Sequence, residues 1–439
     1  MSLLTASRKR LAGEAGWVFA GQLASAVGTL VGLRLVTEVV PPSIYGSVVL
    51  AIGIVVLAQG LAVTPMMQAA LRFHPECTGT SGESELRRTV VAALRRPVVW
   101  GFALLVVVLG AWYQSIGGTA FLGLACGALF VVEVARTFQV VFLNAARRQR
   151  PMALLVAADA WLRPVLAVVA VLVFGVSALA VVGGYIAGTT LTLAGFAVLS
   201  RSEHHVRVLP RPANQQEGVA GAGELWMYAK PLILLPLVGW VSGQADRYII
   251  GGLAGLELAG IYAAVYGLAS RPFLMLSNGV ELTLRQVYYA RVSVGDRSGQ
   301  RRVFAVWLAA VLGASLALLV TIALLHQQIA SVLLASEYRV YSSLMIWIGA
   351  GYVFVGCTQV VERICYARND TRGVTLAQIG GAALSLFIVP PMVLAYGIQG
   401  AAWAVPVYFG GQFLLTAARA RYVLYGKARK LSDSTYDRS

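Results

Sequence analysis

Charged residues are scarce in this sequence of 439 residues, and their scarcity excludes a protein that is surrounded by water. Asp, Glu, Lys and Arg together make up 12% of it, whereas a soluble domain carries about 25%. Hydrophobic residues make up 58%. They form long blocks such as 97–113, 164–176 and 303–325, and several blocks reach the ~20 residues that a bilayer requires. The composition therefore predicts an all-α membrane protein.

Cysteine and histidine are also rare, which argues against metal and redox chemistry. The four cysteines, Cys77, Cys126, Cys357 and Cys365, show no metal-ligand spacing, and three of them fall inside hydrophobic blocks. The four histidines are scattered, apart from an adjacent pair in a polar loop. We therefore expect no metal site, no cofactor and no disulfide bond, and no cluster of catalytic residues emerges.

Acidic residues are fewer than basic ones: the sequence has 19 Asp and Glu and 35 Lys and Arg, which gives a formal net charge of +16. In a soluble protein such an excess would suggest a nucleic-acid partner. Here most basic residues lie in short polar gaps between hydrophobic blocks, which is the distribution that the positive-inside rule describes. The excess therefore indicates membrane topology, and no nucleic-acid partner is expected.

The hydrophobic blocks predict about twelve transmembrane helices. Basic residues recur in every second gap, and the other gaps contribute only Arg339, so both termini are expected in the cytoplasm and the protein in the inner membrane. Residues 84–96 are predicted to form an amphipathic helix at the inner interface that steers the next span. The expected spans are 15–40, 45–70, 97–115, 118–143, 152–175, 178–200, 229–251, 258–283, 303–325, 341–366, 373–395 and 399–418.

A long polar stretch near the middle of the chain predicts two halves of six helices each. Residues 201–225 contain Pro210, Pro212 and Asn214 and are typical of a linker. The expected organisation is an N-terminal lobe at 1–205, a cytoplasmic linker at 206–225, a C-terminal lobe at 226–420 and a cytoplasmic tail at 421–439. Weak internal similarity around the first and seventh helices agrees with two repeats related by an axis along the membrane normal.

Several ionisable residues fall inside the predicted spans, where they are costly and usually face a bundle interior or a wet cavity. Arg34 and Glu38 are four positions apart, as are Asp159 and Arg163, and Glu133 lies three positions before Arg136. Residues at these spacings share one helix face. Two interpretations stay open: ion pairs that only stabilise helix packing, and charged faces that line a polar cavity between the halves.

The buried bases are mostly arginines, which suits an anionic substrate. A guanidinium group stays charged and offers a planar fork of donors that fits phosphate better than the point charge of lysine. Arg271 has no acidic residue within four positions in the sequence and is followed by Pro272, so it is the best single candidate. The predicted cationic cavity comprises Arg34, Arg136, Arg163, Arg247 and Arg271.

The buried acids are candidates for ion coupling or for charge pairing with these arginines. A carboxyl group buried in a membrane can exchange protons near neutrality, while an adjacent arginine favours its charged form. The four candidates are Glu38, Glu133, Asp159 and Asp246.

Three short stretches resemble one family of transporters. One is Val39–Gly46 and another is Tyr396–Trp403. The third has two parts, residues 244–251 (Gln-Ala-Asp-Arg-Tyr-Ile-Ile-Gly) and residues 258–266 (Leu-Ala-Gly-Ile-Tyr-Ala-Ala-Val-Tyr). The chain resembles Wzx-type polysaccharide-biosynthesis flippases of the multidrug/oligosaccharidyl-lipid/polysaccharide exporter (MOP) superfamily. Pro41-Pro42 departs from the Gly-Pro-like pair that is more frequent in that family.

The resemblance implies two six-helix bundles arranged as a V, of the MATE type, that work by alternating access. It implies a substrate made of a polyprenyl-diphosphate carrier and an oligosaccharide, which would be a repeat unit of O-antigen, capsule or exopolysaccharide. It also implies a cationic central cavity, coupling to protons or sodium ions, contact with membrane lipids and cooperation with polysaccharide assembly machinery. Asp246 and Arg247 match the family's Asp-Arg motif.

Two other functions remain open. An ion-coupled multidrug exporter of the same superfamily would favour acidic, aromatic cavities, and the arginine-rich interior argues against it. A membrane glycan polymerase or glycosyltransferase would need a large outer loop or an acidic nucleotide-metal motif. The sequence offers neither feature.

Overall fold

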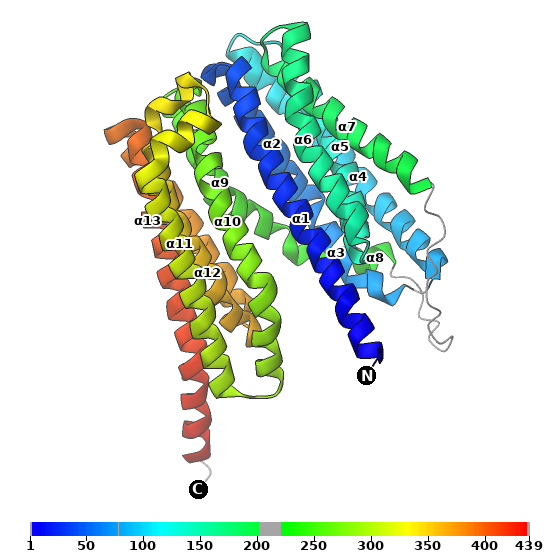
Figure 1. Ribbon diagram of the computed structural model, residues 1–439, viewed down its shortest axis with the longest axis vertical. Coiled ribbons are helices and arrows are strands. Elements are labelled where there is room, and N and C mark those ends of the chain that lie inside the picture. Colours follow the sequence, from blue (N-terminus) through cyan, green and yellow to red (C-terminus); the bar gives the residue numbers. More distant parts are fainter. Residues whose placement is uncertain (1, 78, 202–220, 437–439) are drawn as a thin grey trace. The chain divides into compact units, whose positions relative to one another are not determined.

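The computed structural model describes residues 2–77, 79–201 and 221–436, and every regular element within these ranges is a helix (Figure 1). The predicted all-α fold is therefore confirmed. The elements are α1 (Ser2–Val39), α2 (Pro42–Ala62), α3 (Thr64–Phe73), η1 (His74–Glu76), α4 (Gly79–Ser115), α5 (Phe121–Ala145), α6 (Gln149–Phe174), α7 (Ala178–Arg201), α8 (Ala222–Ala229), η2 (Lys230–Leu232), α9 (Leu234–Leu253), α10 (Leu256–Ser293), α11 (Arg297–Leu333), η3 (Ser336–Tyr341), α12 (Leu344–Ala367) and α13 (Thr371–Tyr436).

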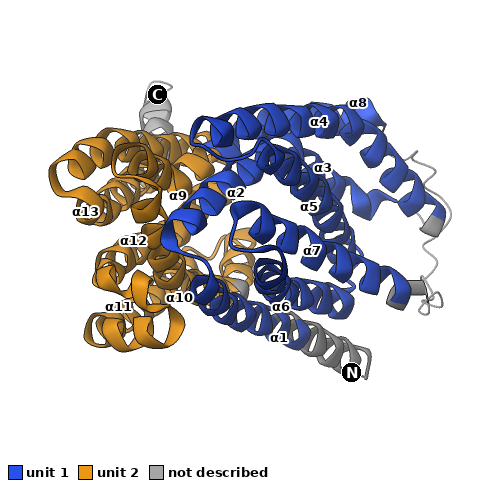
Figure 2. Ribbon diagram, turned by 90° about the horizontal axis from the view of Figure 1, so that it is seen from above, with its two compact units in different colours: residues 1–237 blue, residues 238–439 orange. Residues whose placement is uncertain are grey.

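The chain forms two compact units, residues 1–237 and residues 238–439, which Figure 2 distinguishes by colour. In unit 1, α6 packs against both α1 and α7, while α5 packs against α2, α4 and α7. In unit 2, α10, α11 and α12 pack against one another and α12 packs against α13. Each unit thus has its own helical bundle.

Eleven helical segments of the described chain are long and hydrophobic enough to cross a membrane. The last of them, Thr371–Leu424, has 54 residues, which at 1.5 Å per residue is about 80 Å and more than twice the ~30 Å hydrocarbon core. Gly397 interrupts it with φ +60° and ψ −142°, a conformation that only glycine adopts readily. Two crossings in this segment agree with the predicted count of about twelve.

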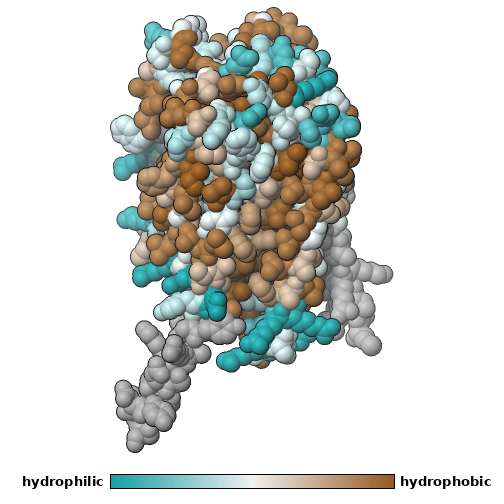
Figure 3. Space-filling model, turned by 90° about the vertical axis from the view of Figure 1, so that its left-hand side faces the viewer, coloured by the Kyte–Doolittle hydropathy of each residue, from teal (hydrophilic) through white to brown (hydrophobic). Residues whose placement is uncertain are grey.

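The surface agrees with a multi-pass membrane protein. Large hydrophobic side chains such as Trp100, Leu324 and Phe387 are exposed, where a bilayer would cover them. On the face shown in Figure 3, hydrophobic side chains cover most of the middle, and hydrophilic ones gather toward its two ends.

Several predicted boundaries were wrong because hydropathy marks the membrane-embedded part of a helix, not its full length. Residues 84–96 are helical as predicted, but they belong to α4, which begins at Gly79 and continues to Ser115. The gap between the expected spans 258–283 and 303–325 is mostly helical, with only residues 294–296 between α10 and α11. The single helix expected at 45–70 is divided at Val63, directly before Thr64-Pro65 at the start of α3.

Two predicted segments at the ends of the lobes can be placed only in part. Most of the linker at 206–225 lies outside the described residues, and α8 begins at Ala222. The predicted tail at 421–439 is helical as far as Tyr436, because α13 continues through it.

Two glycines of α7 allow a close contact with α6 in unit 1. A Cβ atom on Gly188 would lie 2.7 Å from the Cα and 2.8 Å from the N of Arg163 on α6. Gly184, one turn earlier, faces the backbone of Ala167 in the same way. Small residues let membrane helices approach this closely, so Gly188 fixes the distance between α7 and the charged residues of α6.

We predict that Gly188→Ala destabilises the protein, because the added methyl group must push α6 and α7 apart, at a cost of about 1–3 kcal/mol. The measurement is thermal unfolding of the purified protein in detergent. Gly183→Ala is the matched control, since a Cβ at Gly183 meets no atom within 4 Å. Equal melting temperatures for the two variants would contradict this account of the contact.

Candidate functional site

Four charged side chains of the predicted site meet inside unit 1 and form what we call the charge cluster: Glu133, Arg136, Asp159 and Arg163. Glu133 and Arg136 lie one turn apart on α5, and Asp159 and Arg163 lie one turn apart on α6. Each pair therefore shares a helix face. The packing of α5 and α6 brings the two faces together, so the four groups form one network.

Both arginines of the charge cluster reach both carboxylates. Arg136 donates from Nε to Glu133 Oε2 at 2.9 Å and pairs with Asp159 Oδ2 at 3.5 Å. Arg163 pairs with the other oxygen of Glu133, Oε1, and with Asp159 Oδ1 at 3.7 Å. Two negative and two positive groups make the cluster electroneutral, which is what burial in a bilayer requires.

Neutral polar groups lie around the charge cluster, and the sequence pattern did not predict them. Thr189 on α7 donates its hydroxyl hydrogen to Asp159 Oδ1 at 2.9 Å. The guanidinium carbon of Arg163 lies 5.9 Å from the centre of the Tyr185 ring. The side-chain amide of Gln59 on α2 donates to the main-chain carbonyl oxygen of Glu133 at 3.3 Å and to the Thr137 hydroxyl at 2.6 Å.

A weak signal for these neutral groups exists in the sequence. Tyr185 and Thr189 are four positions apart and so share one face of α7. Gln59 is an isolated amide in a hydrophobic span of 21 residues.

Exposure differs sharply within the charge cluster. The side chains of Glu133 and Asp159 are 8% and 7% exposed, whereas those of Arg136 and Arg163 are 24% and 25% exposed. The carboxylates therefore lie behind the arginines and hold them in place. The outer edges of the guanidinium groups keep donors that an additional anion can accept.

Arg34 and Glu38 form a different kind of pair. Arg34 Nη2 lies 2.7 Å from Glu38 Oε2, four positions away on α1, and the two side chains are 30% and 56% exposed. An ion pair this exposed is worth little where water reaches it. The predicted pairing is present, but a role in substrate or ion binding remains a prediction.

Asp246 and Arg247 lie buried within unit 2, among tyrosines. Asp246 Oδ2 accepts a hydrogen bond from the Tyr262 hydroxyl at 2.8 Å, and its Oδ1 accepts one from the backbone N–H of Arg247 at 2.8 Å. The guanidinium group of Arg247 lies 4.6 Å from the centre of the Tyr266 ring and donates to the Gly243 carbonyl at 3.2 Å. Only 8% of Arg247 is exposed, so its partners here are groups of its own unit. A place for Arg247 in a substrate cavity remains a prediction.

The remaining candidate, Arg271, is half-buried on α10, directly before Pro272 in the interior of that helix. Another ion-pair network in unit 2 was not among the candidates. Arg363 on α12 and Arg285 on α10 both contact Glu281 Oε1, at 2.9 Å and 3.1 Å. Within the described residues, no group of His, Cys, Asp and Glu is arranged to hold a metal ion.

The comparisons with known proteins identify the fold. No protein-family model matches the chain, and no curated protein matches it in sequence. Several solved structures are similar to it in fold. A lipid II flippase, MurJ, in an inward closed conformation is 12% identical with a TM-score of 0.70, over 93% of this chain and 87% of that one.

Two further structures carry the name of the superfamily. An inward-facing multidrug resistance MATE family transporter of the MOP superfamily has a TM-score of 0.69 at 12% identity, over 91% of this chain and 95% of that one. A MOP superfamily transporter from Pyrococcus furiosus, described as having a binding pocket of reverse polarity, has a TM-score of 0.60 at 14% identity, over 94% and 93%. The chain therefore has a MOP-type fold over nearly its whole length.

The charge cluster gives a direct prediction for stability. Glu133→Gln removes the carboxylate that contacts both Arg136 and Arg163 and leaves an excess positive charge in a half-buried site, so we expect a loss of about 3 kcal/mol. Glu38→Gln removes the exposed carboxylate that pairs with Arg34, and it should lower the free energy of unfolding by less than about 1 kcal/mol. Denaturant unfolding in detergent measures both. A loss for Glu38→Gln as large as that for Glu133→Gln would refute the assignment of the cluster as a buried network.

Proposed function

From the fold that the chain shares with a lipid flippase and with MATE transporters, we propose that it is a transporter and not an enzyme. Its substrate is a polyprenyl-diphosphate-linked oligosaccharide, a repeat unit of O-antigen, capsule or exopolysaccharide. Transport runs across the inner membrane by alternating access, and polysaccharide assembly enzymes use the product.

The observation that carries this proposal is the difference in exposure within the charge cluster. A diphosphate is a dense anion, and a guanidinium group binds phosphate oxygens through two parallel, charge-assisted hydrogen bonds. Arg136 and Arg163 are about three times as exposed as the two carboxylates behind them. They therefore present donors while their positions stay fixed, which suits the headgroup of a lipid-linked sugar.

Binding of the diphosphate would disturb the internal neutrality of the cluster, which suggests how an ion is coupled to transport. A phosphate that draws Arg136 or Arg163 toward itself leaves Glu133 and Asp159 less well compensated in a buried site. Such a carboxylate gains from taking up a cation, either a proton or a sodium ion. Substrate binding and cation binding would then favour each other, since coupling of two sites is reciprocal. Glu38 and Asp246 remain secondary candidates for the same role.

A multidrug exporter is the second candidate, because a MATE transporter is nearly as similar in fold as the flippase. The charge cluster argues against this alternative. An organic cation would meet the more exposed arginines before it met the carboxylates behind them, and like charges repel.

The test is transport of a fluorescent polyprenyl-diphosphate-linked sugar in proteoliposomes. Arg136→Gln and Arg163→Gln should each lower the transport rate at least tenfold, because they remove the charge and the fork of donors. Arg136→Lys and Arg163→Lys keep the charge but lose the fork of donors. Their transport rates should lie between those of the Gln variants and that of the wild type.

Arg72→Gln is the control, since Arg72 pairs with Glu76 on an exposed surface outside the cluster, and it should keep the wild-type rate. Wild-type transport by all four cluster variants would reject the proposed site. Efflux of a cationic dye by the wild-type protein, without transport of the lipid-linked sugar, would support the multidrug exporter instead.

A further inference from the structure

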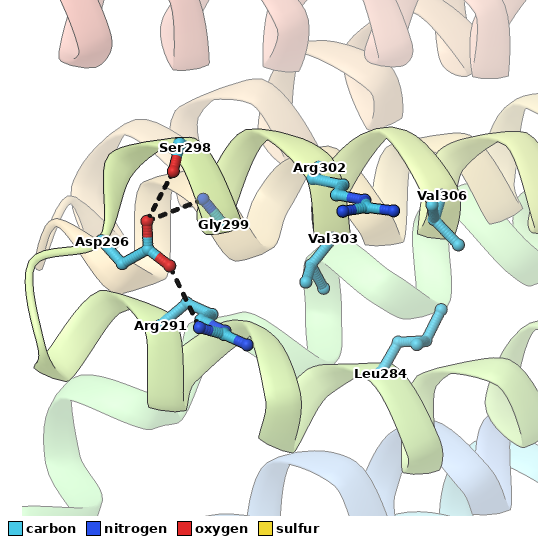
Figure 4. A pocket seen from close by; sticks show the side chains of 8 residues that line it. All are labelled: Leu284, Arg291, Asp296, Ser298, Gly299, Arg302, Val303 and Val306. Carbon is cyan, nitrogen blue, oxygen red and sulfur yellow. Dashed lines mark hydrogen bonds and ion pairs between the residues drawn. The ribbon is translucent and has the colours of Figure 1, made fainter.

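A pocket of about 570 Å³ lies in unit 2 where α10 turns into α11 (Figure 4). Its walls come from the end of α10, the short turn and the first turns of α11. The lining residues are Leu284, Arg291, Asp296, Ser298, Gly299, Arg302, Val303 and Val306.

The single acid of the pocket is fully engaged. Asp296 Oδ1 accepts hydrogen bonds from the N–H of Gly299 at 2.9 Å and from the Ser298 hydroxyl at 2.8 Å, and its Oδ2 accepts one from Arg291 Nη1 at 3.1 Å. These bonds, led by that from Gly299, lower the pKa of Asp296 below its ordinary value. Asp296 is therefore a charged N-cap of α11, and its negative charge is directed at donors of its own turn.

Arg302 provides the positive charge that the turn leaves uncompensated. Figure 4 shows its side chain beside Val303 and Val306 in the pocket wall. Among the described residues, no ion pair or hydrogen bond involves Arg302. Arg291 has one nitrogen paired with Asp296 and further donors left over. Two guanidinium groups against one carboxylate give the pocket a net positive charge.

The other wall of the pocket is apolar, because its residues belong to two hydrophobic helical segments. The segment Leu256–Ser293 contributes Leu284, and the segment Arg297–Leu333 contributes Val303 and Val306. Both segments are long and hydrophobic enough to span the membrane. The turn itself lies beyond the hydrophobic spans expected at 258–283 and 303–325. Leu284, Arg302 and Val303 lie at the edges of those spans, where hydrocarbon gives way to lipid headgroups. A ligand held here meets arginine on one side and methyl groups on the other.

We propose that this pocket binds an anionic phospholipid, with Arg302 and Arg291 contacting the headgroup phosphate and Leu284, Val303 and Val306 contacting the first methylene groups. Basic pockets at the ends of membrane helices suit anionic headgroups. Free phosphate would use only the arginines, so the apolar wall favours the lipid. The site is separate from the charge cluster and does not depend on the proposed substrate.

The test is native mass spectrometry of the full-length protein, released from detergent with a fixed amount of phosphatidylglycerol or of phosphatidylcholine with the same acyl chains. We expect the wild-type protein to retain phosphatidylglycerol preferentially. Arg291→Gln combined with Arg302→Gln should weaken that binding about tenfold. Arg302→Gln alone, which breaks no contact within the turn, should weaken it about threefold to fivefold.

The matched control is Arg297→Gln combined with Arg301→Gln, which removes the same charge from the same turn at positions that do not line the pocket. This control should retain phosphatidylglycerol nearly as well as the wild type. An equal loss in both double variants, equal retention of phosphatidylcholine, or displacement of the lipid by millimolar inorganic phosphate would each overturn the proposal.

Discussion

The contact of Glu133 with two arginines is the interaction on which the site in unit 1 depends. A carboxylate that is 8% exposed, within a bundle of membrane-spanning helices, must be compensated, and Arg136 and Arg163 compensate it from two different helices. This contact ties α5 to α6, while the close approach of Gly188 to Arg163 ties α6 to α7. Charge compensation and helix packing therefore constrain each other, and neither arginine can turn away without leaving a buried charge behind.

The same contact also explains why the cluster suits an anionic substrate. An isolated buried arginine would be too costly to maintain, and one fully enclosed by carboxylates would have no donors left. The observed arrangement lies between these limits, because the acids are buried and the arginines are partly exposed. Arg247 illustrates the enclosed limit, since it is 8% exposed among an adjacent aspartate and tyrosine rings.

The sequence allowed much of the architecture and part of the site to be predicted. Hydropathy located the spans, because burial in a bilayer acts on composition alone. It did not locate the ends of α4, α10 and α11, which continue as helices beyond the membrane-embedded part. Helical spacing identified both ion pairs of the charge cluster, Glu133 with Arg136 and Asp159 with Arg163.

Helical spacing could not show that the two pairs meet. That depends on how α5 and α6 are rotated about their axes, which is a property of tertiary packing. The contributions of Thr189 and Gln59 were missed for the same reason, since each comes from a helix other than α5 and α6. Asp246 and Arg247 were identified from the sequence, and Tyr262 and Tyr266 stood in the same stretch that resembles the family. The sequence did not show that these tyrosines of α10 surround the pair, or that Tyr352 of α12 joins them.

The most direct test of this account is an experimental structure of the full-length protein in a lipid nanodisc with a polyprenyl-diphosphate-linked sugar bound. The account predicts diphosphate oxygens about 3 Å from guanidinium nitrogens of Arg136 and Arg163, with at least one of their bonds to Glu133 or Asp159 lengthened. A diphosphate bound elsewhere, with all four side chains of the charge cluster still paired as they are here, would contradict it.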